Sequence, residues 1–117
     1  MWHSKYSTGI TELDNDHAHI DAVIGYVAES ADPESEKRHL MDVYCAIISH
    51  VQYKNDLLGP DLSREEQEHD TKFLRDVRSK MQERATGLIS RRQLITDLRQ
   101  MLMMHAMSHE NEERLSA

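Results

Sequence analysis

Four of the eight histidines in this sequence stand where an amphipathic helix would carry an apolar side chain. His17, His50, His69 and His105 each continue a stripe of apolar residues at three-and-four spacing. An imidazole can bind iron, zinc, copper or nickel, and it can also exchange a proton near neutral pH. These four side chains are therefore the first candidates for chemistry.

The same spacing predicts the helices that must position them. Glycine (four residues) and proline (two) are scarce, and the alternation typical of strands is absent. The pattern predicts an N-terminal arm followed by helices at residues 12–29, 33–58, 64–84 and 91–115. Because the connections are short, we expect an all-α fold, an antiparallel up-down-up-down four-helix bundle.

The four histidines are predicted to lie at one level of this bundle. His17 and His69 come about six residues after their helix starts, while His50 and His105 precede their helix ends by roughly seven and ten residues. A single histidine on an apolar stripe is usually a core residue with a hydrogen-bond partner. Four buried imidazoles at one level need four sets of partners, whereas a metal ion satisfies several at once. The sequence therefore predicts a metal site.

Carboxylates near the histidines would favour iron or manganese. Glu65 lies one turn before His69, and Glu110 follows His105 in the last helix. Both acids also have simpler explanations: Glu65 suits the positive start of a helix, and Glu110 belongs to a polar tail. Glu66 has the spacing of a capping-box acid, so we expect its side chain at the helix start.

Composition restricts the possible partners and the compartment. The 117 residues carry a net charge of −7 with acids and bases interspersed, which predicts no basic face for nucleic acid. No apolar run approaches the roughly 18 residues of a membrane helix, and no signal peptide is predicted. The single cysteine, Cys45, excludes an internal disulfide and favours the cytoplasm. Nothing in the sequence indicates the oligomeric state.

Four segments resemble motifs of the hemerythrin family, the non-haem di-iron bundles that bind O2. The string W…Y.TGI.ELDNDH, which ends at His17, resembles the family's N-terminal arm and first ligand. HVQYKNDLL from His50, EEQEHDTKF from Glu65 and HAMSHE from His105 resemble its second-, third- and fourth-helix motifs. Because these segments span the chain, residues 1–117 are expected to form a single hemerythrin-like domain.

The resemblance implies two iron ions, joined by an oxo or hydroxo bridge, that bind O2 for carriage, storage or sensing. It places His17 and His50 on one iron, and His69 and His105 on the other. Glu110 would bridge both ions, at a position where the family usually has aspartate.

Two residues depart from the family's pattern. Lys54 stands where the family has a bridging glutamate, and Glu65 stands where it has a further histidine. We expect Glu65 to replace the missing bridge. Lys54 either extends out past the bundle end or pairs with Glu65 or Glu110 beside the metal. The predicted metal ligands are His17, His50, Glu65, His69, His105 and Glu110.

Several functions remain open at this stage. The expected ligand is O2, another small diatomic molecule or a peroxide. The carboxylate-richer site equally suits a small redox enzyme, an oxidase, a peroxidase or an NO-handling centre. A site reduced to one metal, or to none, is the third possibility, and the sequence identifies no catalytic residue. Methionines such as Met101 and Met104 suit either flexible core packing or the apolar lining of a small-gas pocket.

Overall fold

The computed structural model describes residues 11–116, and it describes side chains for residues 14–107. The elements are α1 (Thr11–Ala28), α2 (Pro33–Leu58), the short 3-10 helix η2 (Gly59–Asp61), α3 (Arg64–Ala85) and α4 (Arg91–Ser116). This part of the chain contains no strand, so the predicted all-α class is confirmed, and each helix end lies within one residue of its predicted position. The predicted N-terminal arm lies outside the described residues.

Local capping fixes where the helices begin. The Asp32 carboxylate accepts a hydrogen bond of 2.7 Å from the backbone N–H of Ser35, and Pro33 occupies the first turn of α2, where no amide partner is needed. The hydroxyl of Ser63 accepts a hydrogen bond of 3.1 Å from the backbone N–H of Glu66, which makes Ser63 the N-cap of α3. These starts set the depth at which the inward side chains of each helix lie.

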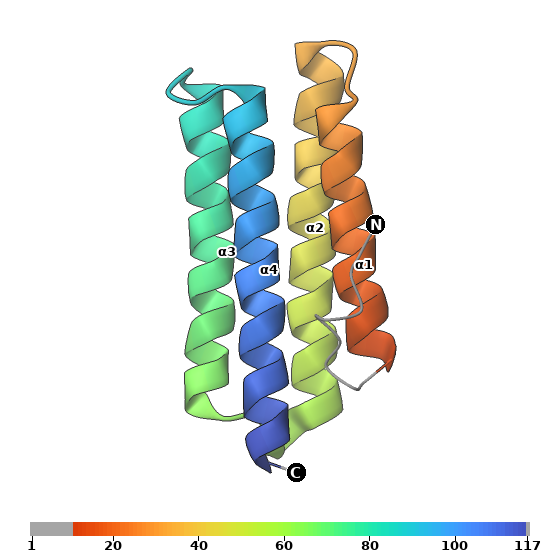
Figure 1. Ribbon diagram of the computed structural model, residues 1–117, viewed down its shortest axis with the longest axis vertical. Coiled ribbons are helices and arrows are strands. Elements are labelled where there is room, and N and C mark those ends of the chain that lie inside the picture. Colours follow the sequence, from red (N-terminus) through yellow and green to blue (C-terminus); the bar gives the residue numbers. More distant parts are fainter. Residues whose placement is uncertain (1–10, 117) are drawn as a thin grey trace.

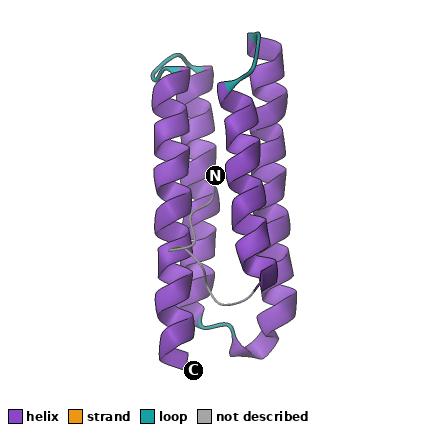
Figure 2. Ribbon diagram, turned by 45° about the vertical axis from the view of Figure 1, so that its right-hand side comes forward, coloured by secondary structure: helices purple, strands orange, loops and turns teal. Residues whose placement is uncertain are grey.

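The four α-helices pack lengthwise into a body of 45 × 26 × 20 Å (Figure 1). Helix α1 packs against α2 and α4, and α3 packs against α4 and α2, which is consistent with a bundle. Figure 2 shows the α1–α2 and α3–α4 connections at one end of the molecule and the α2–α3 connection at the other. None of the helices in residues 11–116 is long and apolar enough to cross a membrane.

The core has two chemically different halves. Toward the end that holds the α1–α2 and α3–α4 connections, the inward stripes are apolar, and their buried residues include Ile24, Val27, Leu40, Val43, Val77, Leu94 and Leu98. Toward the other end, the same stripes continue as polar side chains, namely His17, His50, Lys54, Glu66, Asp70 and His105. An apolar half thus holds the helices together, and a buried polar half carries the candidate chemistry.

A charged cluster fastens the apolar end. The buried Glu36 of α2 accepts hydrogen bonds from Arg84 of α3 and Arg91 of α4, and Arg91 also donates to the backbone oxygen of Ser30 at 2.7 Å. Because this cluster joins three helices and the connection that follows α1, it restrains their relative positions at the end opposite the polar half.

Candidate metal centre

Three of the predicted histidines meet inside the bundle. His17 of α1, His50 of α2 and His105 of α4 are 0%, 1% and 6% exposed. The Nε2 atom of His50 lies 3.1 Å from that of His17 and 3.4 Å from that of His105. Three helices therefore direct their imidazole nitrogens at one buried point.

The spacing of these nitrogens suits one metal ion. One potential ligand nitrogen from each ring lies within 4.8 Å of the others. At metal–nitrogen distances of about 2.0–2.1 Å, nitrogens on the same ion lie roughly 2.9–3.4 Å apart. Two of the three pairs already have this spacing, and His50 belongs to both.

Neighbouring side chains orient two of the rings. The Nδ1 atom of His50 lies 3.1 Å from a carboxylate oxygen of Asp16, a contact that directs the Nε2 lone pair of His50 into the bundle. The ring of Phe73 stacks on His105, with centroids 4.3 Å apart and planes inclined by 20°. Outer partners of this kind hold metal-binding imidazoles in a fixed orientation before the ion arrives.

Two of the imidazoles are uncharged at neutral pH. Burial lowers the pKa of His17 to about 3, and the nearby charges of His50 and Lys54 act in the same direction. Burial likewise lowers the pKa of His50 to about 4, again with Lys54 contributing and Asp70 opposing. Neutral imidazole is the form that binds a metal. Protons therefore compete little with a metal ion for these two rings at neutral pH.

A buried ion cluster adjoins the three histidines. Lys54 lies one turn after His50 on α2 and is 0% exposed. Its Nζ atom lies 2.6 Å from Oε1 of Glu66 and 3.4 Å from Oδ1 of Asp70, both on α3. The same Asp70 oxygen lies 3.8 Å from Nε2 of His105. Asp70 therefore stands between the ammonium and the histidine cluster, where burial raises the pKa of its carboxyl against the effect of Lys54.

The structure differs from the sequence prediction on α3. Glu65 and His69, both expected to face inward, are exposed, while Glu66 and Asp70 face inward instead. The physical reason is the buried ammonium of Lys54, which draws the two carboxylates into the core and fixes the rotation of α3. The side chain of the sixth predicted ligand, Glu110, lies outside the described residues.

The first expectation for Lys54 and the expectation for Glu66 need correction. Lys54 does not extend out of the bundle, because it is buried and pairs with Glu66 and Asp70. The second expectation, a charge pair beside the histidines, involves these two acids of α3 and not Glu65, while a pair with Glu110 stays a prediction because that side chain lies outside the described residues. Glu66 does supply a backbone N–H to the Ser63 cap, but its carboxylate turns inward to Lys54 instead of completing the capping box. The heptad spacing of Glu66, Asp70, Phe73 and Val77 was the available signal for this face.

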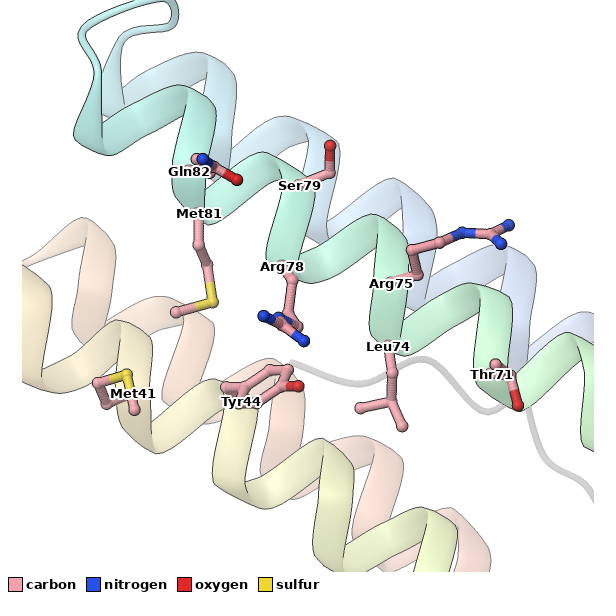
Figure 3. Close-up of a pocket in the computed structure, with 9 residues that line it drawn as sticks. All are labelled: Met41, Tyr44, Thr71, Leu74, Arg75, Arg78, Ser79, Met81 and Gln82. Atoms are coloured by element: carbon pink, nitrogen blue, oxygen red, sulfur yellow. The ribbon is translucent and has the colours of Figure 1, made fainter.

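Two surface pockets lie on different sides of α3. One of about 180 Å³, between α3 and α4, is lined by His105 and Phe73 together with His69, Lys72, Asp76, Met101 and Met104. It connects the surface with one of the three clustered histidines. The other, of about 960 Å³, lies between α2 and α3, where Tyr44, Leu74 and Arg78 point into it (Figure 3). Its lining includes none of the three histidines.

The lowered histidine pKa values predict how the metal-free protein responds to acid. Unfolded histidine takes up a proton near pH 6.5, whereas folded His17 and His50 resist protonation until about pH 3–4. The free energy of unfolding should therefore fall as pH drops below 6.5, by up to about 1.4 kcal/mol per pH unit for each imidazole. Urea titrations in the presence of a chelator, between pH 7 and 5, measure this slope.

Two matched variants test whether the buried histidines cause this pH dependence. His17→Leu should remove the contribution of one imidazole to the slope of the free energy of unfolding against pH. His19→Leu, at an exposed position on the same helix, should leave the slope unchanged. Equal slopes in both variants would show that the buried imidazoles do not govern the acid response.

Comparison with known proteins identifies no family for this chain. No protein-family model matches it, and no curated protein or solved structure is significantly similar. The candidate metal centre is therefore defined by its own geometry: three converging buried imidazoles beside a buried ammonium and two carboxylates.

Proposed function

We propose that the protein binds one iron ion between His17, His50 and His105 and uses it to bind O2 or a similarly small ligand. The observation that carries this proposal is the convergence of three buried imidazoles, whose ligand nitrogens all lie within 4.8 Å of one another. Within the same proposal, the helices form the antiparallel up-down-up-down bundle expected from the sequence, which brings one histidine from each of three helices to a single level.

One ion fits the described residues better than the two that a hemerythrin-like site requires. The three imidazoles supply three nitrogens to one point, and Asp70, at 3.8 Å from Nε2 of His105, is placed to supply an oxygen. A second ion would need ligands on α3, but Glu65 and His69 are exposed there. The other inward carboxylate of α3, Glu66, pairs with the ammonium of Lys54.

The donor set supports iron, and the surroundings support a small ligand. Three imidazoles alone suit iron, zinc, copper or nickel, and Asp70 beside His105 would add the carboxylate oxygen that favours iron among them. Bound iron would supply redox chemistry and an open coordination position. The pocket of about 180 Å³ beside His105 is large enough for O2 or peroxide and too small for most metabolites.

The protein's own residues hold and shield the ion in this proposal. Asp16 orients His50, Phe73 orients His105, and the neighbouring apolar core, including Ile20, excludes water. Exclusion of water strengthens every charge interaction in the site and limits side reactions of a bound ligand.

A small redox enzyme is the second candidate, and Asp70 is the observation that favours it. Burial raises the pKa of this carboxyl, which lies beside His105. A carboxyl group beside a redox metal suits the reduction of O2 or peroxide, because it is placed to relay the protons that both reactions consume.

Ligand substitution tests the metal site itself. Binding of ferrous iron is measured under anaerobic conditions. His50→Ala should weaken it by more than roughly 100-fold, because this variant loses a direct ligand. Asp16→Asn should weaken it by roughly 10- to 100-fold, because this variant loses the partner that orients His50. Competition with a chromogenic chelator measures both affinities. His19→Ala is the control at an exposed position, and equal affinities in His50→Ala and His19→Ala would exclude the site.

Exposure to O2 separates the two candidate functions. The ferrous protein should develop a visible absorption band in air that disappears when O2 is removed, as reversible binding requires. A band that decays without recovery would favour the redox enzyme. Iron-loaded protein whose spectrum does not respond to O2 or peroxide would contradict both candidates.

A further inference from the structure

Lys54 is a fully buried cation within the candidate centre. It is 0% exposed, and its Nζ atom lies 2.6 Å from Glu66 and 3.4 Å from Asp70. Transfer of an ammonium from water into a protein core is strongly unfavourable unless carboxylates compensate it, and even a compensated pair rarely adds stability over apolar residues of similar volume. Packing alone therefore gives little reason for a lysine at this position.

The position of Asp70 relates this ammonium to the three histidines. Its Oδ1 atom lies 3.4 Å from Nζ of Lys54 and 3.8 Å from Nε2 of His105. One carboxylate oxygen thus faces both the ammonium and the point where the imidazoles converge. When an ion binds at that point, Asp70 stands between two cations, and Glu66 neutralises the ammonium from its other side.

We infer that the Lys54 ammonium takes the place of a second metal ion, so that the centre holds one exchangeable ion and one fixed, covalently attached cation. The exchangeable ion at the histidines rests on the proposed function, whereas the role of Lys54 as a fixed cation does not. The charges agree with this inference, because Glu66 and Asp70 carry two negative charges against the single positive charge of Lys54, and this excess favours a further cation beside them. The centre then contains two cationic groups, an ammonium and a metal ion, while it binds a single metal.

The inference predicts that Lys54 sets the number of ions bound. Lys54→Glu removes the fixed cation and adds a carboxylate to Glu66 and Asp70, which creates an oxygen-rich site suited to Mn²⁺ or Fe²⁺. Isothermal titration of the metal-free protein with Mn²⁺, followed by metal analysis after gel filtration, should give one ion per chain for the wild type and two for Lys54→Glu.

Lys37→Glu is the matched control, since Lys37 is an exposed lysine on the same helix and its substitution makes the same charge change. It should bind one ion, like the wild type. Two ions in the wild type, or no more ions in a folded Lys54→Glu protein than in the wild type, would overturn the inference.

The Mn²⁺ titration also works if Lys54→Glu does not fold without metal. Circular dichroism during the titration then shows whether helix returns and at how many ions per chain. Recovery of helix at two ions per chain supports a missing second cation, and failure to recover at saturating Mn²⁺ contradicts it.

A double variant separates this inference from the proposed function. Lys54→Glu with His50→Ala should lose the ion at the histidines and retain one at the carboxylates. If the wild type binds no ion and Lys54→Glu binds one, the proposed function fails while the role of Lys54 as a replacement cation stands.

Discussion

The pairing of Lys54 with Glu66 and Asp70 is the interaction on which the polar half of this molecule depends. A buried ammonium must be compensated, and the two acids of α3 can reach it only if that helix turns them inward. That rotation carries Phe73 onto the ring of His105 and leaves His69 on the surface. One ion cluster between α2 and α3 therefore decides which residues of α3 belong to the centre.

The apolar half makes this arrangement possible. Stripes of isoleucine, valine and leucine hold the four helices together, and Glu36 with two arginines fixes the distant end. Burial of apolar area stabilises the fold enough to tolerate the six buried polar side chains of the polar half. The three imidazoles consequently converge before any ion binds, which reduces the free energy needed to organise the ligands. Desolvation also lowers the pKa of His17 and of His50, which favours the neutral state in which they can bind a metal.

Local signals explain which parts of this structure follow from the sequence. Helix starts at Asp32 and Ser63 depend on hydrogen bonds within four residues, so they could be predicted, as could the inward histidines of α1, α2 and α4. The face of α3 could not be chosen in the same way, because His69 and Asp70 both lie within one turn of Phe73 and the histidine is the less polar of the two. A partner on another helix, Lys54, favours the acids, whereas the heptad spacing that Glu66 and Asp70 share with Phe73 and Val77 gives only a weak signal for the same face.

Three imidazoles should hold a single metal ion beside the ammonium of Lys54. X-ray absorption at the iron edge of the loaded wild-type protein tests this arrangement, because the method reports both the ligands and any neighbouring metal. We expect the multiple scattering of three imidazoles at about 2.0–2.2 Å and no iron–iron distance. An iron–iron distance of roughly 3.5–4 Å, the separation typical of two-metal sites, or a ligand shell without imidazole would contradict it.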